Sequence, residues 1–268
     1  MDEKKMRISV IMGIYNCAST LIEALDSLYA QTYQDFKIIL CDDCSTDNTY
    51  KVAEDYASKH DNILLIKNEK NLRLAATLNH CLEYVDTEYV ARMDGDDISL
   101  PTRFEKEIKF LDDHSEYALV SCPMIYFDES GDWAKGTSKE EPQIIDFIKG
   151  SPFCHAPVMM RRSALNKIGN YTVKKTLRRG QDYYLWHKFY LAGYKGYNLQ
   201  EHLYKMRDDK SATRRRTFKD RLNATKVRLE VYNHLDIPLY CYPTAFKGLI
   251  VGLLPKSIYK KLHQQRFK

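Results

Sequence analysis

Strand-like and helix-like segments alternate through the first hundred residues of the chain. Residues 8–12 and 36–40 are apolar, as buried strands are, and residues 89–93 continue the pattern. Between them, residues 20–28 and 74–85 carry apolar side chains at helical spacing. Strands that are joined through helices predict right-handed crossovers and a largely parallel sheet.

Polar residues follow these strand-like segments at the points where they end. Tyr15 and Asn16 follow the first segment, Asp42 and Asp43 follow the second, and an acidic stretch at residues 94–97 follows the last. Ligands of parallel α/β sheets bind beyond the carboxyl ends of the strands. We therefore expect these clusters, which are far apart in sequence, to meet at one edge of the sheet.

The acidic stretch is typical of a site for a hard metal ion. Asp94, Asp96 and Asp97 follow a strand directly, and Gly95 lets the backbone turn tightly. Clustered carboxylates repel one another unless a cation neutralises them, and Mg²⁺ or Mn²⁺ binds such oxygen ligands together with water and phosphate oxygens. A solvated acidic turn is the alternative. The apolar strand before the stretch and the second aspartate pair at another strand end disfavour it.

Two other classes of nucleotide-binding protein lack their signatures here. No Gly-x-Gly-x-x-Gly follows the first strand-like segment and no Gly-x-x-x-x-Gly-Lys-Ser/Thr occurs, which disfavours dinucleotide enzymes and P-loop NTPases. Cys41 and Cys44 form a lone Cys-x-x-Cys without a second pair or a histidine cluster. We interpret the cysteines as reduced thiols. Because no glycine-rich phosphate loop is present, phosphate binding would depend on a metal ion.

Seven segments of the sequence form an ordered series of motifs. They are SVIMGIYN from Ser9, SLYAQTY from Ser27, FKIILCDDCSTD from Phe36, NLRLAATLN from Asn71, ARMDGDD from Ala91, LPTR from Leu100 and GQDYYLW from Gly180. In this order they closely resemble family 2 of the glycosyltransferases, which have the GT-A fold. The resemblance runs from about residue 7 to residue 211, and the ensemble is far more specific than any single segment.

The resemblance implies a role for each matching residue. Tyr15 would line the nucleotide pocket, and Asp43 would bind the edge of uracil or another base. Asp94 would contact the ribose or the metal, Asp96 would ligate the metal, and Asp182 would be the general base. The implied reaction is the metal-dependent, inverting transfer of a sugar from a nucleotide-sugar, foremost a UDP-sugar, to a hydroxyl group.

Four positions depart from the pattern of the family. Gly13 stands where proline is usual, Arg73 stands where glycine is common, and Gln181 replaces the usual glutamate beside the base. Asp208 stands where a histidine would follow Arg207, although Arg207 itself could still reach the diphosphate. Arg73 and Arg207 are therefore counted with the donor-binding candidates.

Local patterns predict further elements and packing. Thr20 and Glu23 have the spacing of a capping box. Trp186 falls on the same helical face as Asp182, and we interpret it as a packed aromatic side chain, with stacking on a sugar as the alternative. For His155 the sequence allows two roles, one on the acceptor side of the site and one as a buried structural histidine. The elements expected beyond residue 100 are a helix from Pro101, a loop over residues 128–141, a strand over 153–160 and helices over 180–191 and about 213–235.

Charge is divided unevenly between the body of the chain and its tail. Residues 205–268 hold 16 Lys/Arg and 5 Asp/Glu, a net charge of +11. Because the whole chain has a net charge of +5, the first 204 residues have a net charge of −6. This pattern fits a tail that meets an anionic surface and does not fit a general nucleic-acid binder. The apolar stretch at residues 239–254 is too short and broken to span a membrane, so it either lies in the membrane interface or packs on the domain.

These features together predict an α/β protein with a GT-A (Rossmann-like), mostly parallel sheet, flanking helices and a helical basic extension. We expect a catalytic domain at residues 1–205, divided near residue 97 into donor and acceptor halves, and a separate segment at residues 206–268. A glycan or lipid-linked acceptor at the cytoplasmic face of the cell membrane is expected, with no nucleic acid. The alternatives are a nucleotide-binding scaffold without turnover and a sugar-phosphate nucleotidyltransferase. The latter would need a glycine-rich, basic loop after the first strand.

Overall fold

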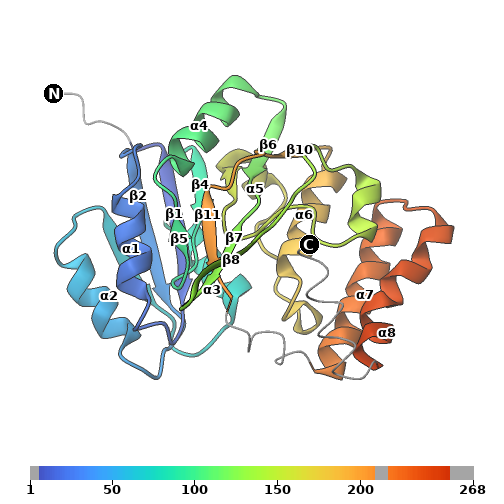
Figure 1. Ribbon diagram of the computed structural model, residues 1–268, viewed down its shortest axis with the longest axis horizontal. Helices are drawn as coiled ribbons and strands as arrows, with labels where there is room; N and C mark the ends of the chain where they lie inside the picture. Colours follow the sequence, from blue (N-terminus) through green and yellow to red (C-terminus); the bar gives the residue numbers. More distant parts are fainter. Residues whose placement is uncertain (1–5, 209–216, 254–268) are drawn as a thin grey trace.

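A seven-stranded sheet runs through the centre of the molecule (Figure 1). The computed structural model describes residues 6–208 and 217–253 of the chain. The strand order is β10-β6-β9-β4-β1-β2-β3, and β9 alone in this sheet runs antiparallel to its neighbours. The strands are β1 (Ile8–Ile14), β2 (Phe36–Asp42), β3 (Ile63–Lys67), β4 (Tyr89–Arg92), β6 (Tyr117–Ser121), β9 (Met159–Arg161) and β10 (Lys195–Asn198). The predicted, mostly parallel sheet is confirmed.

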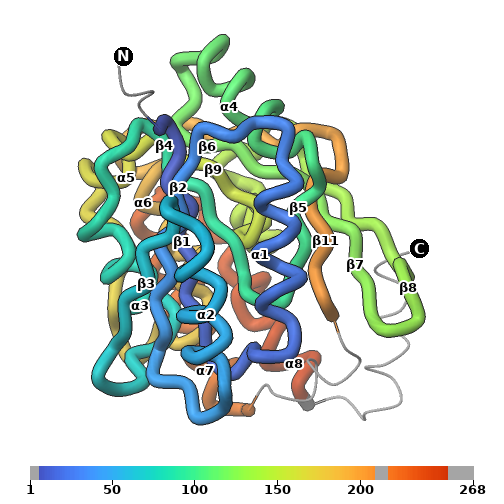
Figure 2. The backbone as a smooth tube through the Cα atoms, turned by 90° about the vertical axis from the view of Figure 1, so that its left-hand side faces the viewer, coloured from blue at the N-terminus to red at the C-terminus, as the bar shows by residue number. Residues whose placement is uncertain are grey.

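Helices cover both faces of this sheet (Figures 1 and 2). Side chains of α1, α2 and α4 share one hydrophobic core with the sheet, and side chains of α3, α5, α6 and α7 share the other. The α-helices are α1 (Leu21–Tyr29), α2 (Thr49–Ala57), α3 (Leu74–Leu82), α4 (Arg103–Asp113), α5 (Arg162–Lys167), α6 (Gln181–Leu191), α7 (Phe218–His234) and α8 (Lys247–Leu253). Short 3₁₀ helices are η1 (Ile144–Ile148), η2 (Lys175–Leu177) and η4 (Leu239–Phe246).

The alternation of side chains along β1 explains why both faces are covered. Val10 and Met12 pack in one core with Leu25 of α1, whereas Ile11 packs in the other core with Leu78 of α3. Successive side chains of a strand point to opposite faces, and a parallel strand is apolar on both because helices lie on both. The continuous apolar run that predicted this strand has that origin.

A smaller sheet lies beside the large one, and none of its four strands was predicted from the sequence. Its order is β5-β11-β7-β8. The strands are β5 (Ile98–Ser99), β7 (Ile125–Asp128), β8 (Gly131–Lys135) and β11 (Tyr204–Arg207). The prediction of a loop over residues 128–141 was wrong for β8, because Gly131, at a φ of 106°, closes a hairpin between β7 and β8. Figure 2 shows this hairpin beside β11.

Other elements differ from prediction in their bounds. The strand expected over residues 153–160 is limited to Met159–Arg161, whereas the helices expected from Pro101 and over residues 180–191 are present as α4 and α6. The capping box at Thr20 was wrong, because its side chain makes no cap bond to the first turn of α1. A capping box does open α7, where Thr217 and Asp220 bond reciprocally. Residues 213–216, where that helix was expected to begin, lie outside the described residues.

The C-terminal elements pack on the rest of the molecule. Val231 and Tyr232 of α7, and Cys241 and Ala245 of η4, are buried in the core that α6 shares. Among the described residues, no helix is long and apolar enough to cross a membrane. The predicted boundary at residue 205 falls inside β11, so the division into 1–205 and 206–268 stays a proposal. The basic residues predicted to meet a membrane beyond 253 lie outside the described part.

Candidate functional site

The loops after β1 and β2 are bonded to each other at the carboxyl edge of the large sheet. The Asn16 side chain donates to Thr46 Oγ1 over 3.1 Å and accepts the backbone N–H of Thr46 over 2.8 Å. The backbone N–H of Asn16 donates to Ser45 Oγ over 3.1 Å. Both strands are parallel and end in register, so their loops emerge together.

The acidic loop after β4 packs against the first of these loops. Thr20 Oγ1 donates to the Gly95 carbonyl over 2.9 Å, which is the contact its side chain makes in place of a helix cap. A Cβ on Gly95 would lie 2.8 Å from Cys17 Sγ and 3.2 Å from Ile14. Glycine is therefore required for this close approach. The predicted meeting of the three clusters at one edge of the sheet is confirmed.

The three carboxylates of the acidic loop have different surroundings. Asp94 forms an ion pair with the fully buried guanidinium of Arg92. Asp97 is buried and accepts the backbone N–H of Arg207 over 2.8 Å. Asp96 is exposed at the surface of the loop. Desolvation and the Asp94 charge raise the pKa of Asp96, and burial with the charges of Asp94 and Asp96 raises that of Asp97 well above its usual range.

These surroundings fit a divalent cation held by few protein ligands. Desolvation raises the pKa of Asp96 and Asp97 first, and the neighbouring carboxylate charges add to it, so a bound cation would offset both effects. No group of three or more His, Cys, Asp or Glu side chains in the described ranges is arranged to hold a metal. Magnesium-type sites commonly use one or two carboxylates with water and substrate phosphates, and Asp96 has the exposure for this. Asp94 could be a second metal ligand only if its carboxylate bound the metal and Arg92 at the same time.

Asp43 lies at the end of β2 and organises the loop before α3. Its Oδ1 accepts N–H bonds from Asn68 Nδ2 over 2.9 Å and from the Leu72 backbone over 2.7 Å. Its Oδ2 accepts the backbone N–H of Arg73 over 2.9 Å. A carboxylate has about four lone-pair positions, so one position on Oδ2 is left for a further donor. The predicted contact with a base edge stays a prediction and could use only that position.

Arg73 has a backbone conformation that is strained for any residue with a side chain. Its φ of 75° and ψ of 160° lie in a region that glycine occupies freely and other residues rarely adopt. This explains why the family commonly has glycine at the position. The bond from its N–H to Asp43 holds the residue there, and its side chain is exposed beside the loop.

Relief of this strain gives a stability prediction. We expect Arg73→Gly to raise the free energy of unfolding by about 1 kcal/mol, because strain of this kind costs about 1–3 kcal/mol and glycine's greater unfolded-state entropy offsets part of the gain. Urea unfolding followed by circular dichroism measures it. Arg73→Ala is the matched control, since alanine removes the side chain and retains the strain. Equal stabilisation by both variants would contradict this explanation.

Asp182 lies in the first turn of α6, and contacts on several sides hold this helix in place. Gly180, at a φ of 93°, forms the N-cap. Trp186 is fully buried, and its indole N–H donates to Ser151 Oγ over 3.0 Å. Tyr183 donates to the Phe147 carbonyl over 3.0 Å. The interpretation of Trp186 as a packed aromatic is therefore confirmed, and its packing holds Asp182 in place.

Tyr171 lies within electrostatic reach of both Asp182 and the acidic loop. Burial raises the pKa of Tyr171, and the charges of Asp182 and Asp94 add to that effect, while Arg92 opposes it. The Tyr171 hydroxyl and His155 Nε2 are 2.8 Å apart and share a hydrogen bond. Burial and the charge of Arg92 lower the pKa of His155 well below its usual value. A neutral Tyr171–His155 pair thus lies close to both charged groups, Asp182 and the Arg92–Asp94 pair.

A family model describes much of this region. The model named "Glycosyl transferase family 2" matches residues 9–169, more than half of the chain. The match includes the three strand ends and the acidic loop. The chain belongs to glycosyl transferase family 2.

Relatives of this glycosyltransferase match along nearly its whole length. EpsE of Bacillus subtilis (strain 168), a glycosyltransferase by name, is 43% identical over 265 residues, which cover 97% of this chain and 94% of that protein. The UDP-Gal:alpha-D-GlcNAc-diphosphoundecaprenol beta-1,3-galactosyltransferase of Escherichia coli is 30% identical, with 98% of both chains covered. The resemblance read from the sequence motifs is confirmed, and the protein is an enzyme of the glycosyltransferase class.

Solved structures show the same fold. Residues 1-349 of S. aureus TarS match with a TM-score of 0.69 at 22% identity, covering 90% of this chain and 72% of that one. TarS has also been solved with UDP-GlcNAc. The mannosyltransferase PcManGT of Pyrobaculum calidifontis, solved with GDP-Man and Mn²⁺, matches with a TM-score of 0.64 at 19% identity, covering 97% and 79%. The predicted GT-A fold is confirmed.

Arg207 supports the acidic loop of the glycosyltransferase. Its Nε donates to the Asp96 carbonyl over 3.0 Å, its guanidinium forms an ion pair with Glu23, and it lies 4.5 Å from the ring of Phe127. Glu23 was predicted to cap α1 and instead neutralises this arginine. A direct contact of Arg207 with a donor diphosphate would require the ion pair to open, and that contact stays a prediction.

Three residues of the site were missed by sequence reasoning. Arg92 was noted only as part of a motif, Asn68 follows β3, and Tyr204, on β11, accepts the backbone N–H of Asp94 over 3.2 Å. A charged residue inside an apolar strand was a usable signal for Arg92, because a buried charge needs a partner. Asn68 and Tyr204 gave no such signal, since their roles depend on packing between segments distant in sequence.

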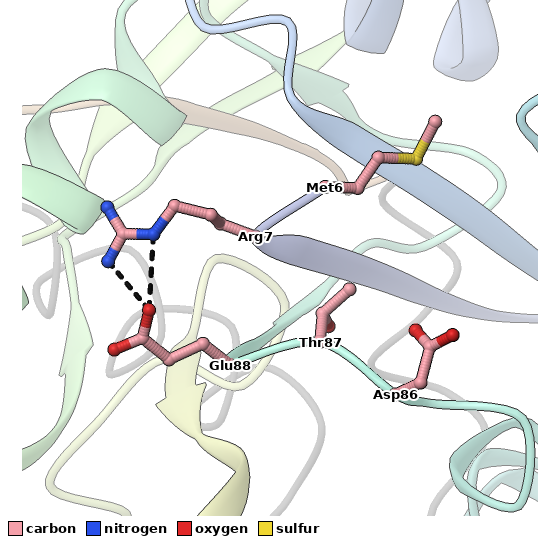
Figure 3. A pocket seen from close by; sticks show the side chains of 5 residues that line it. All are labelled: Met6, Arg7, Asp86, Thr87 and Glu88. Atoms are coloured by element: carbon pink, nitrogen blue, oxygen red, sulfur yellow. Dashed lines mark hydrogen bonds and ion pairs between the residues drawn. The ribbon is translucent and has the colours of Figure 1, made fainter. Parts of the chain in front are cut away.

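A hollow lined by five residues lies away from this site. It has a volume of about 470 Å³ and is lined by Met6, Arg7, Asp86, Thr87 and Glu88 (Figure 3). These residues precede β1 and β4, so the hollow is at the amino ends of the parallel strands. Ligands of such sheets bind at the opposite ends. The Arg7–Glu88 ion pair drawn in Figure 3 is therefore assigned to structure and not to substrate binding.

Proposed function

We propose that the enzyme transfers a sugar from a UDP-sugar to a hydroxyl group of a glycan or lipid-linked acceptor, with inversion at the anomeric carbon. The observation that carries the proposal is the meeting of the acidic loop with the loops after β1 and β2 at one edge of the sheet, together with the place of Asp182 in the first turn of α6. One carboxylate group would bind the donor's metal–diphosphate end, and the other would receive a proton. The UDP in the name of the Escherichia coli relative and the UDP-GlcNAc bound by TarS support the choice of nucleotide.

The proposed step uses Asp182 as general base. The acceptor oxygen forms a bond to the anomeric carbon on the face opposite the diphosphate, the bond from that carbon to the diphosphate oxygen breaks, and Asp182 takes the acceptor's proton. A single base and an in-line attack invert the configuration, without a second carboxylate to protonate the leaving group. A bound Mn²⁺ or Mg²⁺ would neutralise charge on the leaving diphosphate.

The donor would lie across the carboxyl ends of β1, β2 and β4. Tyr15, with 45% of its surface exposed, is available to contact the nucleoside, and Asp43 has one acceptor position left for a base N–H. The exposed side chain of Arg73 is proposed to face the donor as well. Asp96, with Asp94, is proposed to hold the metal, and the Mn²⁺ of PcManGT supports a divalent ion in this fold.

The acceptor and location are proposed from the relatives and the tail. The name of the Escherichia coli relative specifies a diphosphoundecaprenol-linked sugar as its acceptor. A net charge of +11 on residues 205–268 would favour an anionic membrane face. We therefore propose bacterial cell-surface polysaccharide synthesis, with peripheral contact at the cytoplasmic face of the membrane.

Calorimetric titration tests the donor site. We expect UDP to bind in the presence of Mn²⁺ at least tenfold more tightly than without it, and more tightly than GDP. Asp96→Ala should abolish the manganese dependence, because the metal loses its exposed carboxylate ligand. Asp61→Ala, which removes an exposed carboxylate before β3, is the control and should bind UDP as the unmodified enzyme does. Manganese dependence that survives in Asp96→Ala would place the metal elsewhere.

A nucleotide-binding scaffold without turnover remains the second candidate. The substitution of glutamine at position 181 favours it, since the family's usual glutamate beside the base is missing. Both the scaffold hypothesis and the transferase hypothesis predict that the protein binds UDP. Sugar transfer that depends on Asp182 is expected only of an enzyme with turnover.

A further inference from the structure

A second cavity lies directly beside Asp182. It has a volume of about 260 Å³ and is enclosed by the first turn of α6, one face of α7 and the segment from η4 to α8. Small side chains leave its space open, namely Ala224, Thr225, Ala245 and Gly248. A Cβ added to Gly248 would meet no atom within 4 Å. No residue of the acidic loop lines the cavity, so it is separate from the proposed donor site.

Three arginines line this cavity, Arg179, Arg221 and Arg228, against two carboxylates. Asp220 accepts the backbone N–H of Thr217 over 3.0 Å as part of the α7 cap, and these bonds, with the charges of Arg179 and Arg178, lower its pKa. Asp182 is the proposed base and would face the acceptor hydroxyl. Three guanidinium groups and two carboxylates therefore line the cavity, and one of these carboxylates is already bonded within the α7 cap.

Arg221 and Arg228 come from α7 and Arg179 from the segment before α6, and all three line the same space. Arg228 lies 5.8 Å from the ring of Tyr183, and its Nη1 is 3.4 Å from the Ile148 carbonyl. Arg221 donates to the Gly248 carbonyl over 2.9 Å, which joins α7 to α8. Arg179 is exposed just before the N-terminus of α6. Guanidinium groups bind phosphate oxygens in paired hydrogen bonds, and an open cavity that they line is suited to a phosphate group.

We propose that this cavity binds a phosphate or diphosphate of the acceptor and thereby places the acceptor hydroxyl at Asp182. The inference rests on the proposed function and narrows its substrate class. Because Asp182 itself lines the cavity, the phosphate would lie next to the accepting sugar. The acceptor class is thus a sugar attached through a phosphate ester, either to a prenyl lipid or to a polyol phosphate, and not a long neutral glycan.

The test is calorimetry on the full chain saturated with UDP and excess Mn²⁺, so that the donor site is filled. The probes are farnesyl diphosphate, farnesol and glycerol 3-phosphate. We expect farnesyl diphosphate to bind and farnesol to bind at least tenfold more weakly. Arg179→Gln and Arg228→Gln should each weaken farnesyl diphosphate binding about tenfold, because each variant removes a charge-assisted hydrogen bond to the phosphate. Arg178→Gln, a neighbouring exposed arginine outside the cavity, is the matched control and should change binding less than twofold.

The outcomes separate this inference from the proposed function. Equal binding of farnesol and farnesyl diphosphate, or unchanged binding in both cavity variants, would overturn the cavity's role while UDP binding leaves the donor site intact. Failure of the unmodified enzyme to bind UDP would instead count against the proposed function. Binding of glycerol 3-phosphate that weakens in the same two variants would extend the acceptor class to polyol phosphates. Its failure to bind beside tight farnesyl diphosphate would assign the cavity to a lipid carrier.

Discussion

Replacing Asp182 by asparagine is expected to lower kcat by about 10²–10⁴-fold, the usual contribution of a general base. Asparagine has nearly the same shape and cannot take the acceptor's proton. The fold should not change, because α6 is held through Trp186 and Tyr183, which the substitution leaves in place. Initial rates of UDP release with a sugar acceptor measure the effect, and calorimetry with UDP and Mn²⁺ should give the same Kd as for the unmodified enzyme.

Two comparisons make this result decisive. Asp61→Asn, a substitution of the same kind at an exposed position before β3, should leave kcat within about twofold, as surface changes away from a site usually do. A rate unchanged in Asp182→Asn would remove this residue from the mechanism. The unmodified protein could instead bind UDP and transfer no sugar to any acceptor tested, including phosphate-linked ones. That result would favour the hypothesis of a nucleotide-binding scaffold over that of a transferase with turnover.

The parts of the fold that could be predicted are those whose cause is local. The apolar run of β1 reflects helices on both faces of the sheet, and the turn residues after it mark its end. Parallel strands bring their carboxyl ends together, so the meeting of the loops after β1, β2 and β4 followed from topology alone. The same rule puts the proposed donor-site residues at the end of the strands opposite to the hollow around Arg7.

The parts that could not be predicted depend on partners far away in the chain. Thr20 and Glu23 have the spacing of a capping box, but the first bonds to Gly95 and the second pairs with Arg207, 184 residues away. Tertiary contacts competed with the local cap and prevailed. β8 was missed for a similar reason, because its pairing with β7 is visible only once the glycine at position 131 is seen to close a hairpin.

Arg73 shows how a departure from a family pattern can carry physical information. From sequence, this arginine in place of glycine was counted only as a donor-binding candidate. The structure shows a positive φ at that residue, which explains the preference for glycine, and the Asp43 bond that holds the strained residue in place. Strained residues cluster at ligand sites, and this one adjoins the proposed base-binding residue.

The largest effect on stability is expected beneath the acidic loop, at Arg103 of α4. This arginine is fully buried between Phe104 and Tyr204, pairs with the fully buried Glu107 over 3.1 Å, and donates to the Arg92 carbonyl over 3.0 Å. Arg103→Met should lower the free energy of unfolding by about 3–5 kcal/mol, because it leaves a buried carboxylate without its cation. Urea unfolding at pH 7 measures the change.

The pH dependence of that loss distinguishes a lost charge partner from lost packing. Burial raises the pKa of Glu107 to about 7, with Arg103 opposing the shift. A carboxyl group whose folded pKa lies above its unfolded value binds a proton that the unfolded chain has released, so stability falls as pH rises between the two values. Without Arg103 the folded pKa rises further, and the fall should extend above pH 7. The double variant Arg103→Met with Glu107→Leu should recover most of the stability and lose the added pH dependence, since replacing both members of a buried pair by apolar groups is often neutral. A single and a double variant with equal stability at every pH would show that Arg103 acts through packing alone.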